Sequence, residues 1–463
     1  MRTRWPEAAA RVRPAAVAGA FYPAEPERLA REVEELLGSV ERFALPLSVP
    51  KALVVPHAGY VYSGPVAAAA YDAIAPARGI VRRVVLLGPA HRVPLRGLAL
   101  PAAEAFETPL GPVALDREAM RELAALAQVK VSEAVHAMEH SLEVQLPFLQ
   151  RTLGDFRLVP LAVGEASADD VAAVLERLWG GPETLVVVST DLSHYHDYDT
   201  ARRVDRATLA RIAACATDIR HEEACGATPL NGLLALARRR GLPVRLLGAC
   251  NSGDTAGGRA RVVGYAAFAL EEPGAPGPEE AGRALLAIAR DAIEEALGLR
   301  PEASQECERA LWLRLRGASF VTLVQQGRLR GCVGSLAPER ALADDVAENA
   351  RAAAFRDPRF PALSRSEWAR CRLEVSLLSA PKPIAFADED ELLACLRPGE
   401  DGVVLEHAGK RATFLPQVWE NVGEPRRFLA ELARKAGIAE GTPLVRCRVS
   451  RYRVAKWTED GPQ

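Results

Sequence analysis

The chain has 463 residues, too many for one ordinary domain, so we expect two or more domains. Its formal net charge is -2, which gives no reason to expect nucleic acid as a partner. No apolar run approaches the ~20 residues of a membrane-spanning helix, so no membrane partner is expected either. The 8 cysteines are scattered without a Cys-x-x-Cys pair, a pattern that favours a reducing cytoplasm over a disulfide framework.

Residues 1–270 alternate apolar strand, loop and helix. This alternation predicts an α/β domain, with a layered sheet flanked by helices. Strands are predicted at the apolar runs that begin at Ala52, Val84, Thr184 and Val244, and a closing strand is predicted at residues 259–270. The predicted helices are residues 26–37, 117–127, 169–179, 200–214 and 228–240.

Four of these strands lead directly to side chains that bind metals or move protons. His57 follows the first strand, His91 the second, and Asp191 and His194 the third, while Cys250 ends the fourth. If the strands are parallel, their carboxyl ends share one edge of the sheet, where ligands bind in open α/β folds. We therefore expect a metal site made by His57, His91 and Cys250. Two imidazoles and a thiolate suit Fe(II), Zn(II) or Cu.

Three further polar residues, Asp191, His194 and His140, can each be interpreted in more than one way. Asp191 and His194, in STDLSHYHD, are further ligands, an acid/base pair, or a helix N-cap beside a surface imidazole. His140, in EHSLEVQLPFLQ, is predicted on a helix with Glu139 and Glu143. It is either a pocket residue or part of a polar helix face.

The sharpest break in composition is EEPGAPGPEE, residues 271–280. Its prolines, glycines and acids cannot pack a core and predict a linker. Residues 281–463 then predict a smaller α+β domain, mainly antiparallel. It begins with an amphipathic helix and continues with hairpins turning at Gln326-Gly327 and Ala408-Gly409.

The segment LRGCVGSL, residues 329–336, carries the most conspicuous cysteine of the second half. Cys332 is either a nucleophilic or redox thiol whose pKa Arg330 lowers, or a small buried residue on a strand.

The first half carries a resemblance to a known family. In consecutive order, VAGAFYPAEPERL, PHAGYVYSGPVAA, LLGPAHR, FETPLGPVALD, EHSLEVQLPFL, STDLSHY and CNSGDTAGGRARVVGY look like the Memo family. That family resembles the class III extradiol dioxygenases, nonheme Fe(II) enzymes that cleave catechol rings. The resemblance implies His57, His91 and Cys250 as the metal ligands, with Fe(II) as the metal and Zn or Cu as alternatives. It places Asp191 and His194 among further polar groups of the pocket.

The second half resembles another family. LRGCVGSL, AAAFRDPRFPALS, DGVVLEH and ATFLPQVWE are similar to the family of the AMME chromosomal-region candidate protein, across residues 277–457. Chains that join the two families resemble the AmmeMemoRadiSam set, in which both accompany a radical SAM protein. This chain has no Cys-x3-Cys-x2-Cys motif, so the implied partner is a radical SAM enzyme acting in trans.

Together these patterns lead us to expect a metal-dependent, nonheme-iron redox enzyme of extradiol-dioxygenase type, acting on a small, catecholic substrate. His194 would be the acid/base, with Asp191 orienting it or acting alongside, and His140 would be a further catalytic pocket residue. Two alternatives stay open at this point. The protein could be a non-catalytic metal carrier or adaptor for the radical SAM partner, or it could be a zinc hydrolase.

Overall fold

This computed structural model describes residues 12–41, 43, 45–272, 274–299, 310–439 and 441–459. The described residues divide into two compact units. The first unit lies within Met1–Val40 and Val49–Gly274, and the second lies within Glu41–Ser48 and Ala275–Gln463. The second unit therefore includes a short segment from the first half of the chain. Among the described residues, no helix is long and apolar enough to cross a membrane.

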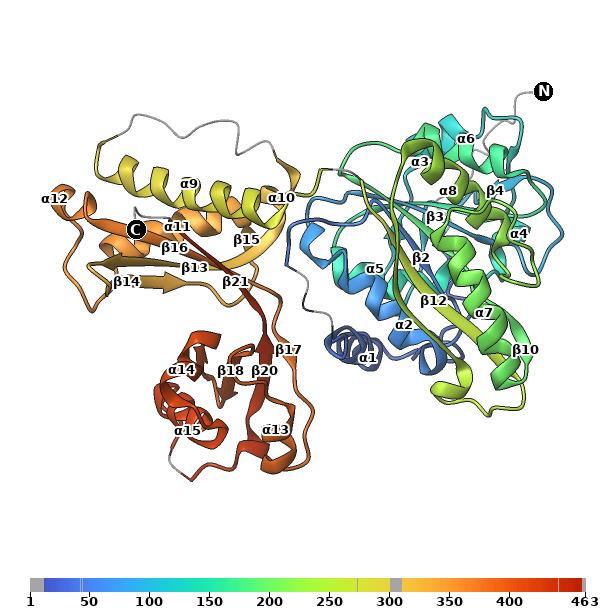
Figure 1. The fold of residues 1–463 in the computed structure, drawn as a ribbon. Coiled ribbons are helices and arrows are strands. Elements are labelled where there is room, and N and C mark those ends of the chain that lie inside the picture. The colour runs from blue at the N-terminus through green and yellow to red at the C-terminus, as the bar shows by residue number, and fades with distance from the viewer. Residues whose placement is uncertain are drawn as a thin grey trace. The chain divides into compact units, whose positions relative to one another are not determined.

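A large mixed sheet forms the centre of the first unit (Figure 1). Its strands in spatial order are β11 (Val244–Asn251), β12 (Val262–Leu270), β2 (Ala52–Val55), β9 (Thr184–Ser189), β3 (Arg83–Pro89), β8 (Arg157–Val163), β4 (Leu98–Leu100) and β7 (Val129–Val131), with β10 (His194–His196) also pairing with β12. A second, small sheet joins β1 (Val12–Arg13), β5 (Ala105–Phe106) and β6 (Val113–Ala114).

The directions of the strands decide which side chains can meet. β2, β9, β3 and β8 are parallel neighbours, so their carboxyl ends lie at one edge of the sheet. β12 runs antiparallel to β2, and β11 runs antiparallel to β12. β11 therefore points the same way as β2 but is separated from it by a whole strand.

Every residue of β2 and β9 is buried, which is the pattern of strands covered on both faces. α2 (Tyr60–Asp72) packs on β2, β11 and β12, whereas α8 (Ala227–Arg240) packs on β3 and β9. The remaining helices of this unit are α1 (Pro26–Gly38), α3 (Arg117–Leu123), α4 (Glu133–Ala137), α5 (Leu146–Leu153), α6 (Ala168–Leu178) and α7 (Tyr198–Ala213). The α/β class expected from the sequence is confirmed. α3 ends four residues before the predicted end.

The helix predicted around His140 is wrong. His140 lies in the turn between α4 and a short 3₁₀ helix at Glu143–Gln145, which leads into α5. α5 begins with Leu146 and Pro147, and proline is well suited to a first turn because it has no N–H to leave unpaired. The Glu139 carboxylate accepts the backbone N–H of Ser141, so this stretch is held by a side chain rather than by helical bonds.

The second unit is α+β and antiparallel, as expected. One sheet contains β14 (Arg328–Gly334), β13 (Arg316–Gln325), β16 (Cys371–Leu378), β21 (Val454–Thr458) and β15 (Arg340–Ala341), and the other contains β17 (Lys382–Pro383), β20 (Arg448–Tyr452), β18 (Gly402–His407) and β19 (Lys410–Phe414). The longer helices are α9 (Pro278–Ala296), α11 (Leu342–Phe355) and α15 (Pro425–Lys435). Both predicted hairpins form. The turn between β13 and β14 has positive φ at Gln326 and Gly327, as a two-residue type I′ turn requires.

Cys332 and Arg330 both lie on β14 but have separate partners. The Arg330 guanidinium pairs with the Glu367 carboxylate at 3.2 Å and donates to the Pro361 carbonyl. The half-buried Cys332 thiol instead accepts a hydrogen bond from the Thr322 hydroxyl at 3.2 Å. Of the two interpretations of Cys332, the one in which Arg330 lowers the pKa of its thiol has no Arg330–Cys332 hydrogen bond among these contacts to support it.

Candidate metal centre

Three neighbouring parallel strands deliver polar side chains to one edge of the large sheet. His57 follows β2 by two residues, His91 follows β3 by two residues, and Asp191 follows β9 by two residues. Because β9 lies between β2 and β3, the chain segments that leave these strands start side by side. The expected convergence of His57, His91 and Asp191 follows from this register.

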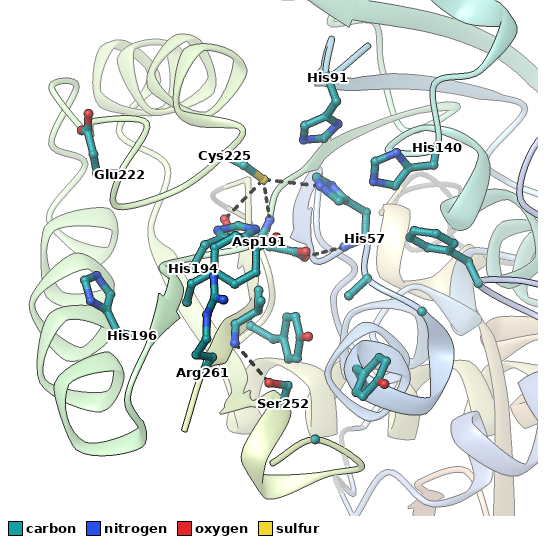
Figure 2. Close-up of a pocket in the computed structure, with 18 of the residues that line it drawn as sticks. His57, His91, His140, Asp191, His194, His196, Glu222, Cys225, Ser252 and Arg261 are labelled. Carbon is teal, nitrogen blue, oxygen red and sulfur yellow. Dashed lines mark hydrogen bonds between the residues drawn. The ribbon is translucent and has the colours of Figure 1, made fainter. Parts of the chain in front are cut away.

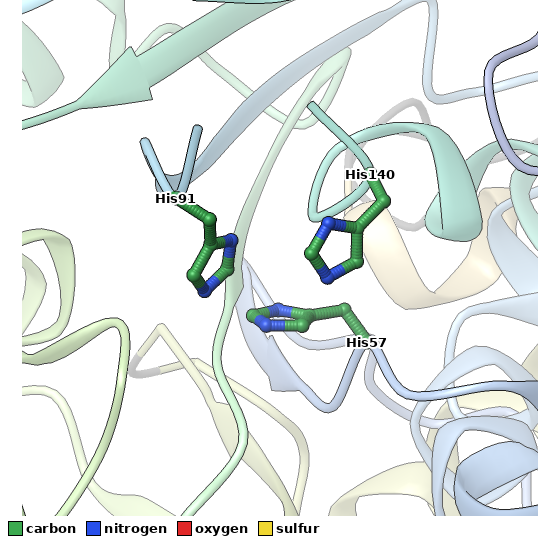
Figure 3. Close-up of side chains that lie close together, drawn as sticks. All are labelled: His57, His91 and His140. Carbon is green, nitrogen blue, oxygen red and sulfur yellow. The ribbon is translucent and has the colours of Figure 1, made fainter. Parts of the chain in front are cut away.

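Three imidazoles meet above this edge (Figure 3). His57, His91 and His140 each offer one ring nitrogen, and these three atoms all lie within 4.8 Å of one another. The ring centroids of His91 and His140 are 4.8 Å apart in a stacked arrangement, and the His57 ring stands edge-on to both. Several imidazoles converging from different elements are the donor set of a transition-metal site.

The hydrogen bonds of His57 decide which of its nitrogens can bind a metal. His57 Nδ1 lies 2.9 Å from the Ser189 hydroxyl, and that hydroxyl donates its one hydrogen to the Ser141 carbonyl at 2.6 Å. Ser189 therefore accepts from His57, so Nδ1 carries the proton. The lone pair is left on Nε2, the arrangement found in metal-ligating histidines.

Glu139 is hydrogen-bonded to His91 and approaches His140. Its carboxylate lies 3.0 Å from His91 Nδ1 and 3.5 Å from His140 Nδ1, and it also accepts the His91 backbone N–H at 2.6 Å. Burial raises the pKa of this carboxyl, but the hydrogen bonds and charge of His91, with the Ser141 N–H, lower it to about 2. A carboxylate behind a histidine fixes the tautomer and the ring orientation, so Nε2 of His91 is also free for a metal.

Two of the imidazoles, those of His57 and His140, are in the neutral form that metals bind. Burial, followed by the nearby imidazoles, holds the pKa of His57 well below its usual value. Burial also lowers the pKa of His140 to about 4. Both side chains are therefore uncharged at neutral pH, and no proton has to leave before they can bind an ion.

Cys250, the third ligand expected from the sequence, is not part of this group. It lies on β11 in register with Tyr265 of β12, so one full strand separates it from β2. Two strand spacings separate the backbones by ~10 Å, and Cys250 is not among the residues that line the pocket in front of the histidines. The sequence correctly predicted that β11 runs in the same direction as β2. It did not reveal that β12 lies between them and separates Cys250 from the histidines.

Asp191 and His194 both line the pocket in front of the histidines, although they are not a hydrogen-bonded pair in the structure. Asp191 is buried and accepts the His57 backbone N–H at 2.7 Å. Burial raises the pKa of Asp191 to about 7. His194 Nδ1 donates to the Leu192 carbonyl at 2.8 Å, and burial lowers the pKa of His194. Asp191 thus holds the His57 turn, and the Leu192 carbonyl orients His194.

The pocket has a volume of about 1160 Å³ (Figure 2). Sequence reasoning missed several of its lining residues, among them Tyr195, Cys225 and Arg261. Tyr195 has a φ of 63°, unusual for a residue other than glycine, and Arg261 lies over its ring. Cys225 comes from the turn before α8, so a pattern based on strand ends does not find it.

Two family models match this chain, one in each half. Residues 13–269 match the model of the family described as Memo-like protein, and residues 286–457 match the AMMECR1 family model. A MEMO1 family protein of Sulfolobus acidocaldarius is 34% identical, over 55% of this chain and 97% of that protein. A MEMO1 family protein of Ignicoccus hospitalis is 38% identical, over 57% of this chain and 99% of that protein. The crystal structure of an uncharacterised protein from Pyrococcus horikoshii covers 39% of this chain and 92% of its own, with 30% identity and a TM-score of 0.36.

Proposed function

The chain belongs to the Memo-like protein family, and on this premise we propose that its first unit is a metal-dependent oxidoreductase. His57, His91 and His140 hold the ion, and Fe(II) is the proposed metal. The observation that carries the proposal is the hydrogen bonding of the Nδ1 atoms of His57 and His91. Ser189 and Glu139 take up the Nδ1 side of His57 and His91, so that the Nε2 side is available to an ion.

A bound Fe(II) would supply the redox step, between O2 and an electron-rich ring such as a catechol. His194 acts as the base in this proposal. Its Nδ1 hydrogen is engaged by the Leu192 carbonyl, so Nε2 carries the lone pair that accepts a proton from a substrate hydroxyl. Asp191 positions the turn that carries His57 by accepting its backbone N–H. A small molecule fits the volume of the pocket.

One feature favours a second candidate, a zinc hydrolase. The ligand group is made of three imidazoles and no carboxylate, and three histidines form a known donor set of catalytic zinc. Nonheme iron oxygenases more often use two histidines and one carboxylate. The identity of the ion therefore separates the two chemistries.

The test is metal analysis and turnover of the full chain purified without oxygen. The proposal expects one iron per chain and O2 consumption when catechols are added. One zinc per chain, with hydrolysis of esters and no O2 consumption, would support the second candidate. Stoichiometric metal with no turnover over a broad panel of phenols would contradict both enzymes, leaving a metal carrier or adaptor for a radical SAM partner as the function to propose. Absence of any bound metal after reconstitution would contradict all three.

A further inference from the structure

One side of the pocket is formed by β10 and the start of β12. His194 and His196 of β10 lie opposite Val263 and Val262, which are adjacent on β12, so Tyr195 is one extra residue in this pairing. The result is a β-bulge, a feature that re-aims side chains and is frequent beside functional sites. Tyr195 has a φ of 63° there. Side chains of a regular strand alternate between its two faces, whereas here all three residues of β10 line the pocket.

Arg261, the residue before β12, lies over the Tyr195 ring, with its guanidinium carbon 4.9 Å from the ring centre. Arg261 also lines the pocket, and Figure 2 shows it apart from the three histidines of the cluster. A guanidinium stacked on an aromatic face is held in place, so it loses less conformational freedom when a ligand binds. Gly258, another lining residue, leaves open space, because a Cβ there would meet no atom within 4 Å.

The charge of Arg261 has no carboxylate partner among the described residues. Two acids line the pocket, but neither pairs with it. Asp191 accepts the His57 backbone N–H, and Figure 2 shows Glu222 well away from Arg261. A second arginine of the lining, Arg92, directly follows one of the cluster histidines in the chain. Arg261 is therefore the lining arginine that can bind the end of a substrate remote from the ion.

We propose that Arg261 binds a carboxylate of the substrate, which makes the substrate an aromatic acid whose ring lies at the histidine cluster. The inference rests on the proposed function and names the class of molecule on which it acts. A guanidinium presents two parallel N–H donors that match the two oxygens of a carboxylate. The pocket volume of about 1160 Å³ exceeds the roughly 300–1,000 Å³ of ordinary small-molecule sites, so a ring and a charged side chain both have room.

The alternative role of Arg261 is structural. In that role its guanidinium covers the Tyr195 ring and stabilises the bulge, without contacting a ligand. A structural arginine makes no difference between a charged ligand and an uncharged ligand of the same shape. Binding of matched charged and neutral molecules therefore separates the two roles.

The experiment measures the binding of such pairs to the full chain, loaded with Fe(II) and kept without oxygen. Each pair is a catechol that carries a carboxylate on zero, one or two methylenes, and the corresponding uncharged carboxamide. In titration calorimetry, at least one acid should bind about tenfold or more tightly than its amide, the effect of a hydrogen bond to a charged group. Arg261→Met should bring that ratio to about one. Arg261→Lys should keep part of it, because the charge remains but the fork of donors is lost.

Arg206→Met is the matched control, because Arg206 is an exposed arginine of α7 outside the pocket lining. It should keep the wild-type ratio, and all three variants should keep the wild-type iron content. Equal binding of acids and amides by the wild type, a preference that survives in Arg261→Met, or its loss in Arg206→Met overturns the inference while the proposed metal centre stands. Loss of iron in Arg261→Met also overturns it. If the wild-type iron form binds no member of any pair, the inference and the proposed catechol chemistry both fail.

Discussion

At the scale of single residues, Glu139 is the support on which the candidate centre most depends. Its carboxylate is hydrogen-bonded to His91 and lies 3.5 Å from His140 Nδ1, so removing its charge should release the His91 ring. We expect Glu139→Gln to weaken metal affinity by about 10- to 100-fold, the usual effect of losing such a partner. Titration calorimetry against the exposed control Glu107→Gln measures the effect. Equal affinities for the two variants would show that the carboxylate does not orient the ligands.

His136 offers a pH-dependent test away from the metal. It is buried, its Nε2 donates to the Ala99 carbonyl, and burial lowers its pKa to about 4. The folded protein therefore prefers the neutral ring, and the stability this gives is present above an unfolded pKa of ~6.5 and is lost as the pH falls toward 4. The advantage of wild type over His136→Gln in urea unfolding should shrink by about 3 kcal/mol between pH 7 and pH 4. A constant advantage across this range would contradict the burial account.

Individual residues also mark how far a sequence can be interpreted. His57 and His91 were predicted because each directly follows an apolar strand, and the structure brings them together. His140 was placed on a helix, because the turn that carries it is held by side-chain bonds that no periodicity reveals. Cys225 was missed because it lies in the turn before α8 and not at the end of a strand. Cys250 was included for a different reason. Which strand ends are neighbours depends on strand order, and a single sequence does not contain that order.

At the scale of elements, a buried ion pair braces the turn that carries Glu139 and His140. The Arg13 guanidinium pairs with Glu143 at 2.6 Å and donates to the Glu139 carbonyl at 2.7 Å. Glu143 in turn accepts the Tyr22 hydroxyl at 2.6 Å. Through Arg13, β1 is therefore hydrogen-bonded to the turn that carries Glu139 and His140.

Breaking this pair should be costly, because it would leave a buried carboxylate without its cation. We expect Arg13→Met to lower the free energy of unfolding by about 3 to 5 kcal/mol. Arg96→Met is the matched control, because the Arg96–Glu165 pair is fully exposed and should contribute little. Urea unfolding of both variants measures the difference. Equal unfolding free energies of Arg13→Met and Arg96→Met would mean that the buried ion pair does not stabilise the fold.

The elements themselves were largely predictable. Amphipathic helices such as α9 and the two-residue hairpins follow from local periodicity and turn chemistry, which a sequence records directly. The boundaries near the site were less predictable. Pro147 and the Glu139 bond to Ser141 interrupt what looks like one helix, and the second of these is a contact of side chain with backbone.

At the scale of the whole molecule, residues 271–280 join the two units and are the expected site of proteolytic cleavage. Glu271, Glu272 and the residues 274–277 form neither helix nor strand, and α9 begins at Pro278. We expect limited proteolysis to cut within residues 271–280 and the bound metal to stay with the N-terminal fragment, since all three histidines lie before residue 141. Mass spectrometry and metal analysis of the separated fragments test this. Metal recovered with the C-terminal fragment would place the centre elsewhere.

The central claim is that three histidines, one of them unexpected as a ligand, form the metal centre. The most direct measurement is the metal stoichiometry of His140→Ala, compared with His196→Ala, whose imidazole lines the same pocket but lies apart from the cluster (Figure 2). The account predicts that His140→Ala loses most of its metal while His196→Ala retains wild-type occupancy. Full occupancy in His140→Ala, together with loss of metal in Cys250→Ser, would contradict it and restore the ligand set first expected from the sequence.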